Sequence, residues 1–184
     1  MFEKILAGLG TVLQDHKIPY MIIGGQAVLL YGEPRLTRDI DITLGVDVDH
    51  LEEVLGVVEK LSLKPLPQDI QKFVRQTMVL PCLHEETGIR VDFIFSYSPY
   101  ETQAIQRAKK IMIKNIDVCF ASVEDLVIHK IFAGRPRDLE DVRSILVRNP
   151  DIDRDYISAW LEQFDASSDE NDFLNSFRSI ISDA

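Results

Sequence analysis

The chain has 184 residues, of which 46% are apolar and 27% charged, enough for one sizeable hydrophobic core and a small helical appendage. Its formal net charge of −10 argues against a general electrostatic affinity for nucleic acid or for an anionic membrane. A polyanionic partner would therefore have to be held by a local basic cluster or by metal ions.

The spacing of the two cysteines and the short length of the apolar runs indicate the cellular compartment of the protein. Cys82 and Cys119 lack the spacing of a zinc site, and two isolated cysteines are expected to be free thiols in a reducing environment. No run reaches the roughly 18 apolar residues that a membrane span requires, and the N-terminus lacks the apolar core of a signal peptide. We expect a cytoplasmic protein without a membrane partner.

The first quarter of the chain predicts two helices and two strands in alternation. Apolar residues at helical spacing predict a helix over residues 2–17, and YMII at 20–23 predicts a short buried strand. GGQAVLLYG at 24–32 predicts a helix that begins at glycine. DIDITL at 39–44 predicts a strand with one core face and one acidic face, because Ile40, Ile42 and Leu44 alternate with Asp39, Asp41 and Thr43.

The remaining segments predict more strands and then helices. Residues 48–62 predict a helix, and Pro65 to Pro67 predict a connection. Residues 76–85 and 89–95 predict two strands around a turn at Thr87 and Gly88. Residues 110–120 predict a hairpin about Asn115. The chain from Ser122 onward is helical by periodicity, with SVED as a capping box. The expected fold is α/β (α+β): a mixed β-sheet flanked by helices over 1–121, with a helical C-terminal part over 122–184 packed on it.

The acidic strand requires a cation. Residues at i and i+2 of a strand lie on one face, roughly 6 to 7 Å apart, so Asp39 and Asp41 repel each other unless a positive group lies nearby. Mg²⁺ takes one or two carboxylates and completes its shell with phosphate oxygens and water. Gly24 and Gly25, at the end of a strand, would let a phosphate approach the backbone and the free N–H groups of the helix start. The alternatives are a simple glycine turn and a solvated strand face.

GGQAVLLYGEPRLTRDIDITL resembles the signature of the DNA polymerase β-like nucleotidyltransferase superfamily: a strand, Gly-Gly or Gly-Ser, a short helix, and Asp-x-Asp on the next strand. It is similar to small bacterial nucleotidyltransferases related to the abortive-infection (AbiEii-type) toxins of type IV toxin–antitoxin systems. The resemblance covers roughly residues 20–146 and includes HKIFAGRPRDLEDV at 129–142, a helix with a lysine followed by a basic-acidic segment. The superfamily often has serine at the position of Gly25, and glycine removes a phosphate-binding hydroxyl.

The resemblance implies a nucleotidyltransferase fold and a set of site residues. It implies that the protein binds Mg²⁺, with Mn²⁺ as an alternative. The implied ligands are three carboxylates that are also the catalytic groups, namely Asp39, Asp41 and Asp92, the last of which lies in RVDFIF. The nucleotide-binding residues that it implies are Gly24, Gly25, Arg35, Thr37, Arg38, Lys130 and Asp138.

Several of these residues have a structural alternative. Asp92 would also fit the exposed alternate position of an edge strand. Lys130 lies in an apolar helix, where a lysine commonly extends its ammonium group to water. DLED is a good capping box, with Asp138 as N-cap and Asp141 at N3 of the following helix. The two arginines near the acidic strand, Arg35 and Arg38, would alternatively pair with surface carboxylates.

The predicted function is transfer of an NMP group from an NTP, such as ATP, to a hydroxyl of an RNA, a protein or a small molecule, with release of pyrophosphate. The resemblance implies tRNA or a small molecule such as an antibiotic as acceptor, and a second copy or a cognate antitoxin as protein partner. The alternative is a non-catalytic nucleotide-binding or regulatory toxin–antitoxin component of the same fold.

Overall fold

The computed structural model describes residues 2–96, 98–167 and 170–182, and the chain divides into two compact units. Unit 1 comprises Met1–Gln26 and Leu36–Ala121, and unit 2 comprises Ala27–Arg35 and Ser122–Ala184. In the described residues, unit 1 contains the β-sheet and unit 2 is built from helices. No helix among the described residues is long and apolar enough to cross a membrane.

The sheet of unit 1 is mixed and has seven strands in the described part of the chain, in the order β3-β4-β5-β2-β1-β7-β6. The pairs β2–β5 and β1–β7 are parallel and the other pairs are antiparallel. The mixed sheet and flanking helices confirm the expected α/β class. The strands are β1 (Tyr20–Ile23), β2 (Asp39–Leu44), β3 (Lys64–Pro65), β4 (Val79–His84), β5 (Ile89–Phe95), β6 (Lys109–Ile113) and β7 (Ile116–Phe120).

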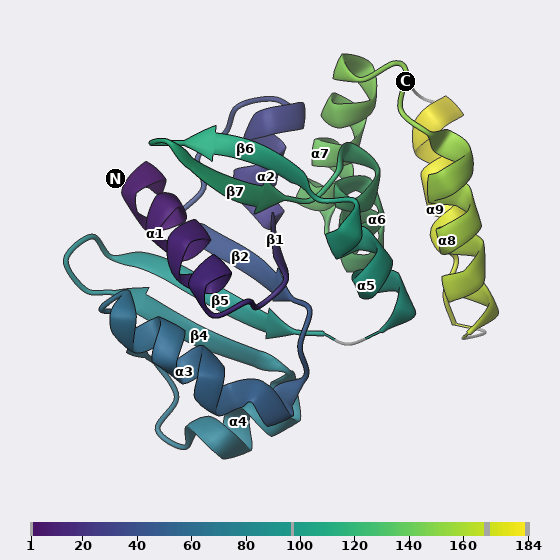
Figure 1. Cartoon of the computed structure of the whole chain (residues 1–184). Helices are drawn as coiled ribbons and strands as arrows, with labels where there is room; N and C mark the ends of the chain where they lie inside the picture. The colour runs from purple at the N-terminus through teal and green to yellow at the C-terminus, as the bar shows by residue number, and fades with distance from the viewer. Residues whose placement is uncertain (1, 97, 168–169, 183–184) are drawn as a thin grey trace. The chain divides into compact units, whose positions relative to one another are not determined.

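One face of this sheet is covered by α1 (Phe2–Asp15) and α3 (Leu51–Lys60), as Figure 1 shows. The apolar stripe of α1 is buried, and Gly10 allows close approach to β7, because a Cβ there would lie 3.1 Å from side-chain atoms of Ile116 and Val118. Through the strand pairing, Val118, Phe120, Ile22 and Ile42 share this face. The intervening residues of β2, including both aspartates, therefore lie on the opposite face.

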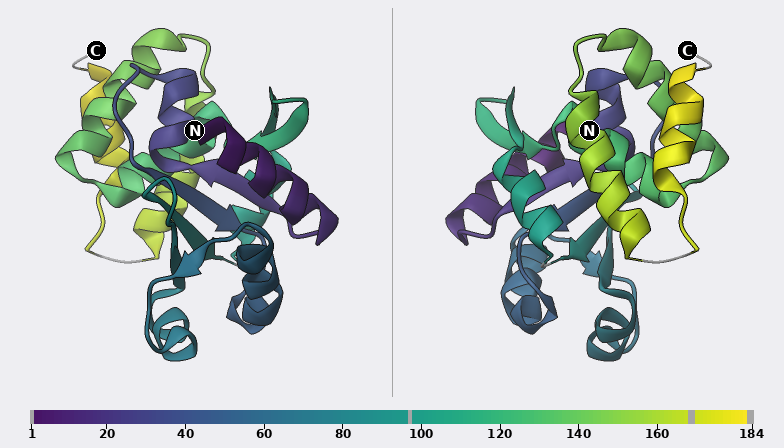
Figure 2. Two further views of the ribbon diagram at one scale, coloured as in Figure 1. Left: turned by 90° about the vertical axis from the view of Figure 1, so that its left-hand side faces the viewer. Right: turned by 90° about the vertical axis from the view of Figure 1, so that its right-hand side faces the viewer.

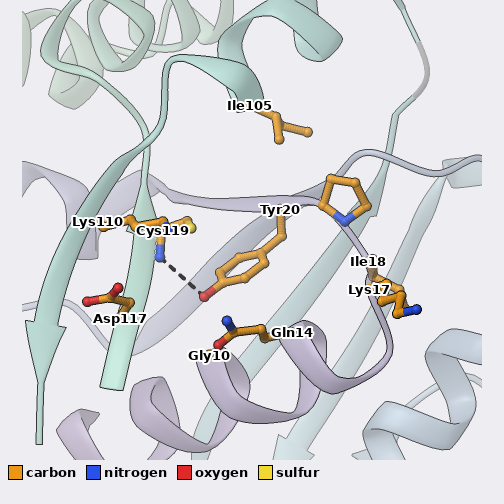
Figure 3. Close-up of a pocket in the computed structure, with 10 residues that line it drawn as sticks. Gly10, Gln14, Lys17, Ile18, Tyr20, Ile105, Lys110, Asp117 and Cys119 are labelled. Atoms are coloured by element: carbon orange, nitrogen blue, oxygen red, sulfur yellow. Dashed lines mark hydrogen bonds between the residues drawn. The ribbon is translucent and has the colours of Figure 1, made fainter. Parts of the chain in front are cut away.

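The Tyr20 side chain connects β1 to β7 near the start of β1, where the two strands are not paired. β1 pairs with β7 only at Ile22 and Phe120, and near the start of β1 the backbone N–H of Cys119 donates to the Tyr20 hydroxyl at 3.2 Å (Figure 3). A cavity of about 350 Å³ adjoins this ring, with Lys17 and Lys110 among its lining residues. Burial raises the pKa of Tyr20 to about 12, so the phenol remains neutral.

Unit 2 contains four helices after Ser122 in the described residues, together with most of α2 (Gly24–Tyr31), whose first three residues belong to unit 1. They are α6 (Val123–Ala133), α7 (Pro136–Arg148), α8 (Arg154–Ala166) and α9 (Phe173–Ser182). α8 and α9 lie side by side (Figure 2), and Phe132 of α6 contacts Phe164 and Phe173 with ring centroids 5.8 and 5.1 Å apart. The predicted SVED cap is confirmed, because the Ser122 hydroxyl accepts from the Asp125 N–H.

Three predicted boundaries are wrong. The first helix ends at Asp15, the strand predicted from residue 76 begins only at Val79, and residues 48–62 form the 3₁₀ turn η1 (Val48–His50) followed by α3. Thr77 belongs to α4 (Ile70–Thr77), an amphipathic helix with Val74 as its buried residue and Asp69 as its N-cap. The sequence analysis did not predict this helix, although Ile70, Phe73 and Val74 stand at helical spacing over its two turns.

Two further elements were also missed. Lys64 and Pro65 pair with β4 as the edge strand β3, a position where proline is tolerated, although the predicted connection over Pro65 to Pro67 includes the second of these residues. α5 (Pro99–Gln106) begins with Ser98 as N-cap and Pro99 in the first turn. Both cysteines are free thiols, as predicted, and burial raises the pKa of Cys82 to about 12.

Candidate functional site

Three predicted carboxylates lie on one face of two neighbouring strands in unit 1. The parallel register of β2 and β5 pairs Asp41 with Asp92 and Asp39 with Arg90. Paired residues of neighbouring strands point to the same side, and neighbouring strands lie about 4.8 Å apart. Asp92 is thus on a central strand of the sheet, between β4 and β2, and the edge-strand alternative for it is wrong.

The glycine pair begins α2 directly against this face. Gly24 has φ +64°, and a Cβ there would lie 2.9 Å from the Asp41 carboxyl carbon and closer still to Oδ2. A side chain at Gly25 would collide with Thr37. Both glycines are therefore required by close packing of the helix start on the acidic strand and its preceding segment.

Side-chain hydrogen bonds connect Asp39 to its surroundings in unit 1. The Thr37 hydroxyl donates to Asp39 Oδ1 at 2.9 Å, and Gln26 Nε2 donates to the Asp39 carbonyl oxygen at 3.4 Å. Arg38 is exposed and forms no ion pair among the described residues. The sequence-predicted residues that the fold gathers here are Gly24, Gly25, Thr37, Asp39, Asp41 and Asp92, with Arg38 in the adjoining segment.

Arg90 is the cation that the acidic face requires, and the sequence analysis missed it. Its Nε donates to Asp92 Oδ1 at 2.7 Å, and this hydrogen bond, with the negative charges of Asp92, Asp39 and Asp41, raises the pKa of the guanidinium. The signal was present in IRVDFIF, because Arg90 is two residues before Asp92 and so shares its strand face.

The donor set fits a magnesium ion in part. Asp39 and Asp41 supply the one or two carboxylates that Mg²⁺ takes in proteins when phosphates and water provide the other oxygens. Among the described residues, no group of three or more His, Cys, Asp or Glu side chains is arranged to hold a metal ion. The roles of Asp39, Asp41 and Asp92 as metal ligands therefore stay predictions.

The other predicted residues form a charge network in unit 2. Lys130 Nζ lies 2.6 Å from Asp138 Oδ1 and 2.8 Å from Asp141 Oδ2. Arg35 binds Asp141 through two hydrogen bonds of 2.8 Å, and Arg135 Nε contacts Asp138 at 2.5 Å. The Lys130 side chain is only 5% exposed. This network joins α6, α7 and the segment that follows α2.

This network shows that three of the structural alternatives predicted from the sequence are wrong. Lys130 does not extend its ammonium group to water, because that group is buried between two carboxylates. Asp138 is not the N-cap of α7, which begins at Pro136 with Arg135 as N-cap, and α7 has no side-chain cap. Arg35 pairs with Asp141, whose side chain is only 6% exposed, so its partner is not a surface carboxylate.

We expect acid to destabilise unit 2 through this network. Burial raises the pKa of Asp138 and Asp141, but hydrogen bonds from Arg135 and Lys130 to the first, and from Arg35 and Lys130 to the second, outweigh burial and hold both below the usual value. The stabilisation is therefore complete above the unfolded-state pKa of about 4 and is lost as pH falls through the lowered values. Asp141→Asn should flatten the fall of Tm below about pH 4, measured by circular dichroism.

The control for this experiment is Asp155→Asn, at an exposed position of α8. It should retain the wild-type dependence of Tm on pH. An Asp141→Asn protein whose Tm falls as steeply as that of the wild type would contradict a stabilising role of the network.

Arg90→Gln should affect metal-free stability and metal binding in opposite directions. Loss of the cation leaves three aspartates on one face, so Tm without metal should fall by about 2–4 °C, corresponding to at most about 1 kcal/mol for a half-exposed pair. The same change should enlarge the rise in Tm that Mg²⁺ produces, because the ion no longer competes with the guanidinium.

The matched control is Arg75→Gln, which removes an arginine whose contact with Asp49, at 3.6 Å, lies on an exposed surface. Its response to Mg²⁺ should equal that of the wild type. An equal rise in Tm on addition of Mg²⁺ in Arg90→Gln and Arg75→Gln would show that Arg90 does not compete with Mg²⁺ for the carboxylates.

The fold of this chain is similar to that of several solved structures. They include the antibiotic-resistance factor ANT(2″)-Ia (16% identity, 98% of this chain and 92% of that chain, TM-score 0.57) and an antigenic nucleotidyltransferase-like protein from Paracoccidioides brasiliensis (16%, 96% and 91%, 0.57). The lincosamide antibiotic adenylyltransferase LnuA is also similar (20%, 73% and 90%, 0.50). At these identities the likeness shows the nucleotidyltransferase fold alone.

A comparison with curated proteins found no match. A family model described as nucleotidyltransferase of unknown function (DUF6036) matches residues 2–181. This match spans nearly the whole chain, including the glycine turn, the acidic strand and the helices of unit 2. The chain therefore belongs to this family of nucleotidyltransferases of unknown function.

Proposed function

We propose that this protein transfers an NMP group from a Mg²⁺-bound NTP to a hydroxyl acceptor. The observation that carries the proposal is the register of β2 and β5, which sets Asp41 beside Asp92 on the face where α2 begins at Gly24. A carboxylate group beside a glycine-started helix provides metal ligands and a backbone anion site in one place. Membership of the nucleotidyltransferase family agrees with this chemistry.

Each residue of the acidic face has a separate task in the proposal. Asp39 and Asp41 would hold the metal that accompanies the triphosphate, which would supply charge to offset the phosphates and to make the acceptor hydroxyl more acidic. The backbone N–H groups at Gly24 and Gly25 contact phosphate oxygens, and Arg38, which has no ion-pair partner among the described residues, offers further positive charge.

Asp92 accepts the proton of the acceptor. The acceptor oxygen then forms a bond to the α-phosphorus, and the bond from this phosphorus to the bridging oxygen of the β-phosphate breaks. Pyrophosphate leaves with the electron pair of the broken bond, and the NMP group remains on the acceptor. The side chains thus supply positioning and proton transfer for an in-line displacement.

The finer parts of the proposal depend on the resemblance of the sequence motifs. They include ATP as donor, RNA, a protein or a small molecule as acceptor, and a role in a toxin–antitoxin pair with a cognate antitoxin. Nucleotide contacts by Arg35, Lys130 and Asp138 also belong here. In unit 2 these three side chains bond within one charge network, so any nucleotide contact would have to be made by side chains that already have ionic partners.

The ion pair between Arg90 and Asp92 favours a second candidate function. Asp92 Oδ1 already accepts a hydrogen bond from the Arg90 guanidinium at 2.7 Å, so this oxygen is occupied by a partner other than an acceptor hydroxyl. A protein that binds Mg²⁺-NTP through Asp39 and Asp41 but performs no transfer would retain this pair. This is the non-catalytic nucleotide-binding alternative.

Asp92→Asn separates binding from chemistry. Since the nucleotide-bearing metal relies on Asp39 and Asp41, the affinity for Mg²⁺-NTP should remain within several-fold of the wild type, measured by calorimetry. NMP transfer should fall by at least roughly 10²-fold, as is typical for loss of one positioned proton-transfer or electrostatic group.

Asp41→Asn is the matched comparison, because it should abolish the rise in Tm that Mg²⁺-NTP produces while leaving the metal-free protein at least as stable. Wild-type transfer by Asp92→Asn would contradict the assigned role of Asp92. A wild-type protein that binds NTP but labels no acceptor would favour the non-catalytic function.

A further inference from the structure

The two edges of the described sheet differ in how they are protected against pairing with another strand. β3, at one edge, has two residues, the second of which is Pro65, and Lys64 forms an ion pair with Glu85 at 2.7 Å. β6, at the other edge, has five residues and contains no proline. A strand of this kind presents backbone groups to which a further strand can bind. The edge at β6 is therefore the one at which the sheet can be extended.

The register of the hairpin shows which backbone groups of β6 face outward. β6 and β7 pair Ile113 with Ile116 around a two-residue turn, and both turn residues have positive φ. Residues that flank such a turn exchange both of their backbone hydrogen bonds, and the direction of these groups alternates along the strand. The N–H and C=O groups of Lys110 and Met112 therefore point away from β7, toward the open edge.

A hydrogen bond on β7 agrees with this assignment. Cys119 is opposite Lys110 in the register, and its backbone N–H donates to the Tyr20 hydroxyl on β1 at 3.2 Å (Figure 3). That N–H points away from β6, as it must in a pair of residues without mutual backbone hydrogen bonds. Lys110 is the other member of this pair, so its own backbone groups point away from β7.

The side chains of this edge are basic at its two ends and apolar in the middle, since residues 109–114 read KKIMIK. Lys109, Lys110 and Lys114 are exposed and form no ion pair in the part of the chain that the structure describes. The hairpin over 109–120 contains one acid, Asp117, although the whole chain has a net charge of −10. Met112, between the lysines, is 72% exposed. Positive charge and an apolar side chain thus lie beside the outward backbone groups.

We infer that β6 binds an extended acidic segment of a partner protein by strand addition. Main-chain hydrogen bonds to Lys110 and Met112 hold the segment, its acidic residues lie beside the lysines at both ends of β6, and apolar residues at its centre cover Met112. A second copy of this chain fits the edge less well, because pairing two β6 strands would bring three lysines of each copy into one interface. The charges therefore favour an acidic partner.

A short peptide of complementary pattern tests this inference on the full chain. The probe is fluorescein-Glu-Glu-Val-Val-Val-Glu-Glu-amide, and its binding is measured by fluorescence anisotropy. It should bind the wild-type protein with an affinity that weakens as salt rises, because the lysines are exposed. A peptide with lysine in place of glutamate, and one with proline in place of the three valines, should each bind about tenfold more weakly or worse, because the first repels β6 and the second lacks main-chain donors.

Lys110→Glu tests the contribution of charge. It should weaken binding of the acidic peptide about tenfold or more, because a lysine beside the bound strand becomes an acid. The matched control is Lys72→Glu on α4, which makes the same charge change at another exposed lysine of unit 1. This control should bind the peptide as the wild type does.

Met112→Pro tests the main-chain contact. It removes an N–H that faces the open edge and leaves the hydrogen bonds between β6 and β7 in place, so Tm should stay within a few degrees of the wild type. Binding of the peptide should weaken about tenfold or more, since a hydrogen bond of the added strand is lost and the proline ring blocks its approach. Met112→Leu, which keeps the N–H and an apolar side chain, should bind nearly as the wild type does.

The outcomes do not depend on the nucleotide site. Failure of the acidic peptide to bind the wild-type protein, or unchanged binding in Lys110→Glu or in Met112→Pro, would overturn the inference. A concentration-dependent dimer that Met112→Pro abolishes, in a protein that does not bind the peptide, would show that a second copy occupies the edge and would also overturn it.

Discussion

Repulsion among carboxylates is the constraint on which unit 1 depends. β2 and β5 place Asp39, Asp41 and Asp92 on one face, and parallel pairing sets two of them opposite each other. Such an arrangement is tolerated only with positive charge nearby, and Arg90 provides it in the metal-free protein. The proposed nucleotide site uses the same constraint, because a magnesium ion would replace part of the function of this guanidinium.

Close packing explains why α2 begins with two glycines. Gly24 makes room for the Asp41 carboxylate and Gly25 makes room for Thr37, so the glycine turn and the acidic strand depend on each other. Unit 2 satisfies its buried charges by pairing: Lys130 lies between Asp138 and Asp141, and Arg35 and Arg135 bond the same two carboxylates. Removing one partner from such a network typically costs about 3–5 kcal/mol.

Local patterns in the sequence predicted what local physics determines. The alternation in DIDITL, the glycine pair and SVED predicted a strand face, a helix start and a cap, and the structure has all three. The pairing of Asp39 with Arg90 depends on which distant strand lies beside β2, and the burial of Lys130 depends on how α6 packs on α7. No periodicity encodes such contacts, which explains the incorrect snorkelling and capping interpretations. The alternation of IRVDFIF does place Arg90 on the face of Asp92, but it cannot show that Asp39 lies beside Arg90.

Transfer of label from two forms of the same nucleotide tests the central claim most directly. The purified protein would be incubated with Mg²⁺, cellular RNA, proteins and small molecules, and with each NTP labelled at either the α- or the γ-phosphorus. The account predicts that α-label becomes covalently attached to an acceptor in amounts equal to the pyrophosphate released, that γ-label never does, and that Asp41→Asn abolishes attachment. Attachment of γ-label, or α-labelling that persists in Asp41→Asn, would contradict it.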